Sequence, residues 1–183
     1  MQINYDFTPV LKISNALKAA GTKVPLILNR AINHTGDKAR NQMRTVLVGQ
    51  TGLKRKTLVK AIKSRKAFGP GAYTIYSKGG DVRLKFFGAR ETRAGVSAAP
   101  WGKRRVYAGT FMKGGKFPKR KALNMGGHVF KRKGQGRLPI EGGRSGLYIA
   151  EEMVSGQSEA AFNAVVDRDL PGRIAHELYR VLG

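Results

Sequence analysis

The chain has 183 residues, with 35 Lys and Arg against 11 Asp and Glu, a formal net charge of +24. Its length and its 41% hydrophobic residues allow a buried core, which excludes wholesale disorder. There is no cysteine, so a disulfide scaffold, a thiol nucleophile and a Cys-ligated metal site are excluded. No stretch approaches the ~20 apolar residues of a membrane span, and we expect no membrane partner.

The positive charge is concentrated in the middle of the chain. Residues 54–137 hold 24 basic and 2 acidic side chains, whereas residues 1–53 hold 7 and 2, and residues 138–183 hold 4 and 7. Of the 24 glycines, 17 fall between Ala67 and Gly146. This distribution predicts a single domain over 1–183, with basic, Gly-rich loops at roughly 88–137.

The N-terminal third is predicted to be mainly helical. Alternation over 3–7 predicts a short strand, and apolar spacings of three and four over 10–17 predict a short helix that Gly21 ends. A long helix is predicted from near Pro25 to about Val48, with residues 49–52 breaking it. Its apolar stripe consists of Leu28, Ile32, Ala39, Met43 and Leu47. Its polar face carries Arg30, Asp37, Lys38, Arg40 and Arg44.

The middle of the chain changes to the period of strands. A short basic helix is predicted first, with Thr57 as its cap and Leu58, Val59 and Ile62 as its apolar side. Alternating residues over 73–75 and 82–86 then predict a β-hairpin around a turn at 77–80. Two more strands are predicted at 106–112 and 128–131, separated by long connections at 88–103 and 113–127.

The C-terminal part is predicted to be helical again. Ser155 is a candidate cap for a helix through Val166, and apolar residues every four positions from Leu170 predict a last helix that Pro171 kinks or starts. The expected fold class is therefore α+β. A long N-terminal helix packs on a small, mainly antiparallel sheet, and C-terminal helices close the core.

Signals for catalysis are weak. The three histidines, His34, His128 and His176, share no metal-ligand spacing, and no nucleophile motif is present. The acidic pairs Glu151–Glu152 and Asp167/Asp169 fall beside predicted helix starts, where the positive end of the helix dipole stabilises carboxylates. We therefore expect no catalytic residues, no metal and no cofactor, and a protein that is not an enzyme.

Clusters of basic residues are the informative feature. Cationic side chains at this density are typical of sequence-independent phosphate contacts, and aromatic residues interleave with them as candidates for base stacking. The alternative is that the charges face an acidic protein neighbour in an assembly. The candidate contacts to DNA or an acidic partner are Lys54, Arg55, Lys56, Lys103, Arg104, Arg105, Lys119, Arg120, Lys121, Lys131, Arg132 and Lys133.

The order of short motifs along most of the chain resembles the minor tail protein Z family, the tail-completion proteins of long-tailed bacteriophages and prophages. The motifs are VP at 24–25, NRAI at 29–32, LKRKTLVK at 53–60, VRLKFFGAR at 82–90, GTF at 109–111, HVFKR at 128–132 and RLPIE at 137–141. After this last motif the chain has GGRSGL at 142–147, where the family pattern leads us to expect a Y-G-P-S type of run.

The resemblance implies a structural virion protein at the head-proximal end of the phage tail tube, assembled in the host cytoplasm. It implies a homo-oligomeric ring, hexameric to match a tail tube. It also implies tail terminator, tail tube or neck proteins as neighbours, and a role in holding the DNA end. The alternative hypothesis is a freestanding protein that binds nucleic acid without sequence preference, which rests on the basic segment alone.

Overall fold

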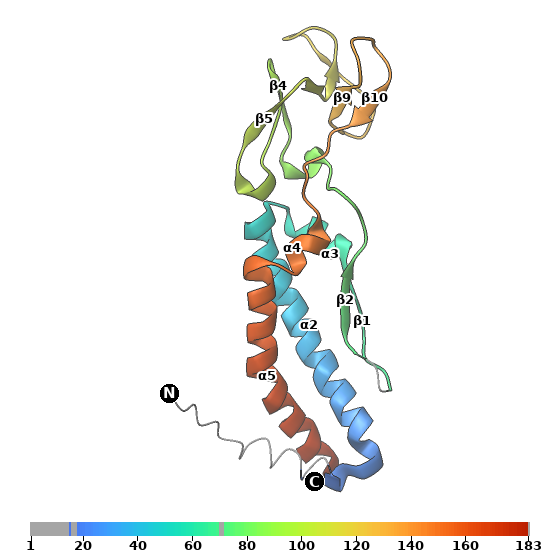
Figure 1. Ribbon diagram of the computed structural model, residues 1–183, viewed down its shortest axis with the longest axis vertical. Coiled ribbons are helices and arrows are strands. Elements are labelled where there is room, and N and C mark those ends of the chain that lie inside the picture. Colours follow the sequence, from blue (N-terminus) through green and yellow to red (C-terminus); the bar gives the residue numbers. More distant parts are fainter. Residues whose placement is uncertain (1–14, 16–17, 70–71, 183) are drawn as a thin grey trace. The chain divides into compact units, whose positions relative to one another are not determined.

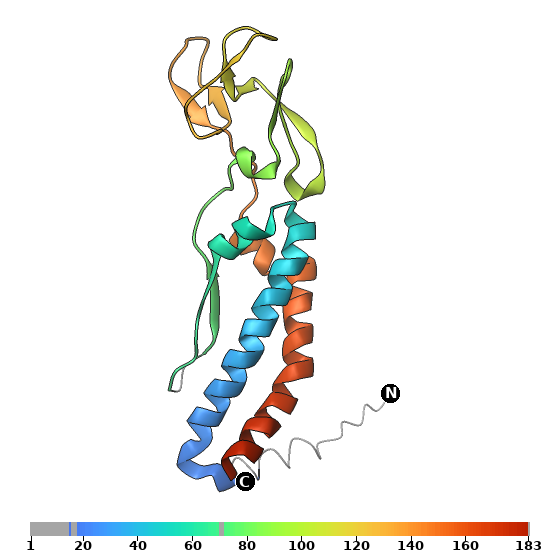
Figure 2. The ribbon, with the colours of Figure 1, turned by 180° about the vertical axis from the view of Figure 1, so that it is seen from behind.

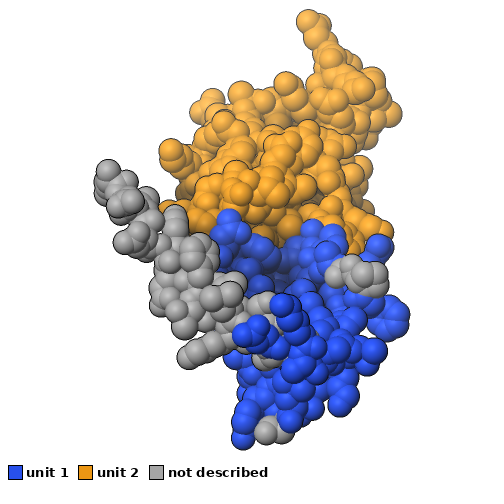
Figure 3. Space-filling view, turned by 60° about the horizontal axis from the view of Figure 1, so that its bottom comes forward, with its two compact units in different colours: residues 1–42, 64–75, 161–183 blue, residues 43–63, 76–160 orange. Residues whose placement is uncertain are grey.

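The computed structural model describes residues 15, 18–69 and 72–182. The strand predicted at 3–7 lies outside these residues, as does all of the helix predicted at 10–17 except Asn15. The chain divides into two compact units (Figure 3). Unit 1 comprises residues 1–42, 64–75 and 161–183, and unit 2 comprises residues 43–63 and 76–160.

The long N-terminal helix is confirmed, but it ends later than predicted. A short 3₁₀ turn, η1 (Gly21–Lys23), leads into α2 (Val24–Thr51). Residues 49–51 continue α2, because Thr51 Oγ1 donates to Leu47 O at 2.5 Å and Gly52 N donates to Val48 O at 3.0 Å. Gly52, at φ +75°, is the residue that ends the helix.

In unit 1, α2 lies beside the C-terminal helix α5 (Gly156–Leu182), as Figures 1 and 2 both show. α5 is one continuous helix with Pro171 inside it, so the prediction of two helices is wrong. Asp167 and Asp169 consequently lie within this helix and not at a helix start. The packed cluster consists of buried Ala20, Ile27 and Leu178 with the half-buried Val24, Ile174 and Val181.

The predicted hairpin between 73–75 and 82–86 is wrong. Instead, β2 (Thr74–Ser77) pairs with β1 (Ile62–Arg65), and residues 84–87 form a 3₁₀ turn, η2 (Leu84–Phe87). The alternation of apolar residues at 82 and 84 does report burial, but the backbone partner of this segment is 143–147. The period of a strand does not reveal which segment pairs with it.

The short basic helix is α3 (Arg55–Ala61) in unit 2. Lys54 occupies its N-cap position and Thr57 lies inside it, so the prediction of Thr57 as the cap is wrong. Leu58 is fully buried as predicted, whereas Val59 is exposed. The buried Arg44 was predicted on the polar face of α2, but its Nη2 donates to the backbone oxygen of Ile62.

Short antiparallel sheets fill the region 88–142 of unit 2, and strands occur within both long connections predicted at 88–103 and 113–127. One sheet has the order β3-β4-β5 (Arg90–Thr92, Gly95–Ala98, Arg105–Ala108), with Val96 paired with both Glu91 and Tyr107. The second has the order β10-β9-β6 (Ile140–Gly142, Phe130–Arg132, Thr110–Phe111), and β7 (Lys113–Gly114) pairs with β8 (Lys121–Ala122). The strand predicted at 106–112 is divided at Gly109, at φ +70°, into β5 and β6, which belong to different sheets. The strand predicted at 128–131 exists as β9, which begins two residues later and ends one residue later.

The remaining elements of unit 2 are the 3₁₀ turn η3 (Pro100–Gly102) and the helix α4 (Ile149–Met153). Glu151 and Glu152 lie in the first turn of α4, a short helix that was not predicted, and not beside a helix that Ser155 caps. Long helices combined with small antiparallel sheets confirm the α+β class. Across the described part of the chain, no helix is both long enough and apolar enough for a membrane crossing.

Candidate functional site

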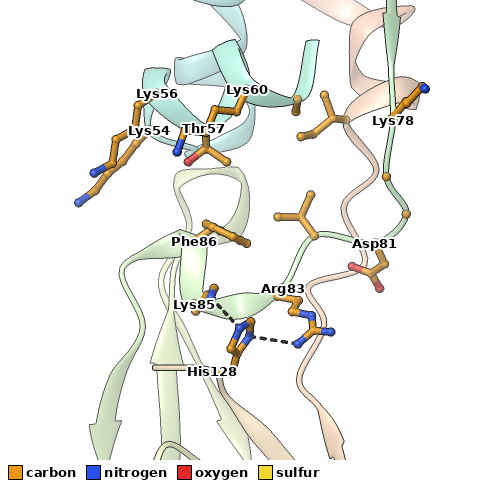
Figure 4. A pocket seen from close by; sticks show the side chains of 15 residues that line it. Lys54, Lys56, Thr57, Lys60, Lys78, Asp81, Arg83, Lys85, Phe86 and His128 are labelled. Carbon is orange, nitrogen blue, oxygen red and sulfur yellow. Dashed lines mark hydrogen bonds between the residues drawn. The ribbon is translucent and has the colours of Figure 1, made fainter. Parts of the chain in front are cut away.

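A hollow of about 680 Å³ in unit 2 gathers basic side chains from segments far apart in the sequence (Figure 4). Its walls come from α3, from the segment 78–86 and from a turn that ends at His128. We call this site the basic hollow. Its lining residues are Lys54, Lys56, Thr57, Lys60, Ala61, Lys78, Gly79, Gly80, Asp81, Val82, Arg83, Lys85, Phe86, His128 and Ile149.

The first wall is the exposed side of α3. Lys56 and Lys60 stand four residues apart and therefore share one side of the helix, while the buried Leu58 anchors the opposite side. Lys54, at the N-cap position, extends beside Lys56 in Figure 4. None of these three lysines has an ion-pair partner among the described residues. Their charges are therefore available to a ligand.

The second wall is positioned by backbone pairing between the segments 82–84 and 143–147. Val82 N donates to Leu147 O at 2.9 Å, and Leu84 N donates to Gly143 O at 3.1 Å. Val82 and Leu84 are buried, so the intervening Arg83 points the other way, as alternation along an extended chain requires. Lys85 follows in η2 and lies at the same hollow.

The single acidic residue of the basic hollow is already engaged by backbone donors. Asp81 Oδ1 accepts hydrogen bonds from Ser145 N at 3.1 Å and from Gly146 N at 2.8 Å. Figure 4 shows its carboxylate beyond Arg83, on the side away from Lys54 and Lys56. Asp81 therefore fixes the loop at 145–146 and leaves most of the positive charge of the hollow uncompensated.

His128 lies between two cations. Lys85 Nζ is 2.6 Å from His128 Nε2, and Arg83 Nη1 is 3.1 Å from His128 Nδ1 (Figure 4). The turn that presents the ring contains Gly126 and Gly127, both at positive φ, and closes with His128 N donating to Met125 O. Burial lowers the pKa of His128 below its usual value, and the charges of Lys85 and Arg83 lower that pKa further.

The chemistry available here is anion binding. Six Lys and Arg side chains and a histidine line one hollow with one engaged carboxylate, an arrangement that concentrates positive potential. Phe86, 39% exposed, adds an aromatic surface, with Lys85 Nζ 5.2 Å from its ring centroid. Within the described ranges, no group of three or more His, Asp or Glu residues is arranged to hold a metal ion.

The basic hollow brings together only two of the twelve residues selected from the sequence, Lys54 and Lys56. Arg55, between them, turns away and donates to Thr45 Oγ1 at 2.7 Å. The others lie outside the hollow. Lys103, Lys119, Lys121 and Lys131 are exposed, and Lys133 lies 3.9 Å from Glu141.

Four arginines of the predicted clusters make hydrogen bonds or ion pairs with other groups of the same chain. Arg104 Nη1 donates to Ser97 O at 3.3 Å, and Arg105 Nε donates to Tyr107 Oη at 2.7 Å. Arg120 forms an ion pair with Glu91, which is only 9% exposed. Arg132 donates to the backbone oxygen of Arg137, and its guanidinium lies 5.3 Å from the ring centroid of Phe111. These four arginines stabilise loops and strands of unit 2.

Five basic lining residues were not selected from the sequence: Lys60, Lys78, Arg83, Lys85 and His128. The sequence did contain a local signal for three of them, Lys60, Arg83 and Lys85. Lys56 and Lys60 have the helical spacing of four, and Arg83 and Lys85 alternate with buried residues. No local signal connects His128 to Lys85, because they are 43 residues apart in the sequence.

Comparisons of this chain with models of protein families, with curated proteins and with solved structures find no match.

Proposed function

We propose that this protein is a structural component of a phage virion that contacts DNA, a tail-completion or neck protein at the head-proximal end of the tail tube. The observation that carries the DNA part of the proposal is the basic hollow of unit 2, with its free lysines on α3 and its single, engaged carboxylate. The tail part rests on the order of sequence motifs. The protein acts through assembly, as a homo-oligomeric ring beside tail terminator, tail tube or neck proteins, and has no catalytic role.

The contact with DNA is electrostatic and independent of sequence. Lysine ammonium groups on a helix attract phosphates as point charges and read no base edges. Each phosphate neutralised releases condensed counterions, so affinity falls steeply as salt concentration rises. A surface of this kind suits a protein that holds whichever DNA end enters the tail.

The test of DNA contact is a pair of triple variants with equal charge loss. Lys54→Gln, Lys56→Gln and Lys60→Gln together remove the α3 wall of the basic hollow. Lys116→Gln, Lys119→Gln and Lys121→Gln remove three exposed lysines outside it. Duplex DNA binding is measured between 50 and 200 mM salt. The α3 variant should reduce the slope of log K against log salt by about 2 to 3, and the control by less than 1. Equal slopes for the two variants would contradict the proposal.

The test of location is independent of DNA binding. Electron microscopy of intact particles, with the chain traced in an averaged map, should place it at the head-proximal end of the tail. Absence of the chain from purified particles would remove the tail proposal. In that case the alternative function, a freestanding nucleic-acid-binding protein, would be the one that the basic hollow supports.

A further inference from the structure

The neighbours of His128 do not provide all the hydrogen-bond partners that its imidazole requires. A neutral imidazole carries one N–H donor and one acceptor nitrogen. Both ring nitrogens of His128 face a cationic donor, Lys85 Nζ at 2.6 Å and Arg83 Nη1 at 3.1 Å. Ammonium and guanidinium groups accept no hydrogen bonds. Whichever nitrogen carries the hydrogen, that N–H therefore points at a group unable to accept it.

The surroundings of this triad add positive charge. Among the described residues, Lys85 Nζ has one further hydrogen-bond acceptor, Gly126 O at 3.4 Å, which is long for a hydrogen bond. From α3, Lys54, Lys56 and Lys60 line the same hollow. Asp81, its only carboxylate, accepts from Ser145 and Gly146. An anion at the triad would supply the acceptors that the protein itself does not.

We infer that Arg83, Lys85 and His128 form a discrete site for one phosphate group, the anchor point within the basic hollow. Phosphate oxygens accept from the Arg83 guanidinium, from the Lys85 ammonium and from an N–H of the imidazole, which are all charge-assisted contacts when His128 is protonated. The bound anion offsets the repulsion between the three cations, so His128 takes up a proton as phosphate binds.

This inference rests on the proposed function for the source of the phosphate, a DNA chain, but its first test needs no DNA. The probe is inorganic phosphate, added to the full chain labelled for imidazole NMR at pH 6.5 to 7 and constant ionic strength. The signal assigned to His128 by the variant His128→Gln should shift and its pKa should rise, while the signals of His34 and His176 stay in place. An unmoved His128 signal would overturn the inference.

Variants distinguish phosphate binding at this site from non-specific electrostatic attraction to the positively charged protein. Arg83→Gln and Lys85→Gln should each weaken inorganic phosphate binding about tenfold, as expected for loss of a charge-assisted hydrogen bond. Lys116→Gln removes the same charge from an exposed position outside the basic hollow and should change phosphate affinity less than twofold. Equal weakening by all three variants would also overturn the inference. Circular dichroism confirms that each variant is folded.

Two DNA probes then identify the source of the phosphate group. A duplex with 5′-phosphates and the same duplex with 5′-hydroxyls are compared for the native chain and for Arg83→Gln. A loss of affinity confined to the phosphorylated duplex assigns the site to a terminal phosphomonoester. An equal loss for both assigns it to backbone diesters. If inorganic phosphate shifts the NMR signal of His128 but neither duplex binds, the phosphate site at the anchor point is supported and the DNA part of the proposed function fails.

Discussion

Asn33 pairs with the backbone of Ala67 through both ends of its side-chain amide. Asn33 Nδ2 donates to Ala67 O at 3.0 Å, and Asn33 Oδ1 accepts from Ala67 N at 2.7 Å. One turn earlier on α2, Asn29 Nδ2 donates to Gly69 O at 3.0 Å. The two asparagines thus supply to residues 67–69 the hydrogen bonds that a neighbouring strand would otherwise supply.

The first prediction concerns this amide. Asn33→Asp keeps the size of the side chain but removes the donor, so Ala67 O loses its partner and faces a carboxylate. We expect the free energy of unfolding to fall by about 1 to 3 kcal/mol. Urea denaturation at pH 7 measures the change. Asn163→Asp, at an exposed position of α5, is the control and should change stability little. Equal effects would mean that the pairing contributes nothing.

The second prediction concerns the residue that ends α2. Gly52 has φ +75°, and an added Cβ would lie 2.7 Å from Gly102 N and 2.8 Å from Ala99 O. Gly52→Ala should therefore cost at least about 2 kcal/mol of stability. Gly49→Ala, three residues earlier, meets nothing within 4 Å and should stabilise the helix by about 0.5 to 1 kcal/mol. Thermal unfolding of both variants checks the opposite signs, and a shared sign would contradict the backbone geometry.

The third prediction separates a structural arginine from an exposed lysine beside it. Arg120 pairs with Glu91, which also accepts from Met112 N at 2.7 Å. Arg120→Met leaves this nearly buried carboxylate without its cation and should lower stability by about 2 kcal/mol. Lys119→Met, at an exposed position, should leave stability within about 0.5 kcal/mol. Denaturant titration measures both variants, and unchanged stability of Arg120→Met would show that the ion pair is dispensable.

The fourth prediction is a pH dependence of stability. Burial and neighbouring cations lower the pKa of His128, and burial, Arg173 and Lys38 lower that of His34. The unfolded chain therefore binds more protons than the folded one around pH 6.5, so stability should fall as pH decreases through this region. Urea unfolding at pH 7.5 and pH 5.5, in chloride buffer without phosphate, measures the loss.

The variant His34→Gln/His128→Gln should show a smaller loss over this interval. His176→Gln, at an exposed position of α5, controls for the removal of an imidazole and should behave like the native chain. An undiminished pH dependence in the double variant would assign the effect to other groups.

Local sequence signals predicted the helical parts of the fold well. The apolar stripe of α2 is a repeating signal, and each turn of a helix depends on residues three and four positions away. The error at its C-terminal end arose because Gly49 and Gly52 look alike in sequence. They differ in whether another part of the backbone, Ala99 and Gly102, approaches them.

The candidate site was only partly predictable, for a related reason. Lys54 and Lys56 were selected because they are basic and close in sequence, and so was Arg120, which the structure pairs with Glu91. A cluster of charges in the sequence does not indicate which members meet a carboxylate or a carbonyl. That distinction depends on acceptors supplied by distant segments.

The sequence by itself determined the concentration of charge between residues 54 and 137, the exclusion of thiol chemistry and the two long helical regions. The tertiary structure decided which segment pairs with 82–84, which cations remain free, and that His128 lies between Arg83 and Lys85. The physical reason is the range of the interactions. Composition and helical periodicity are carried by neighbours in the chain, whereas strand partners and the walls of a site are set by contacts across many residues.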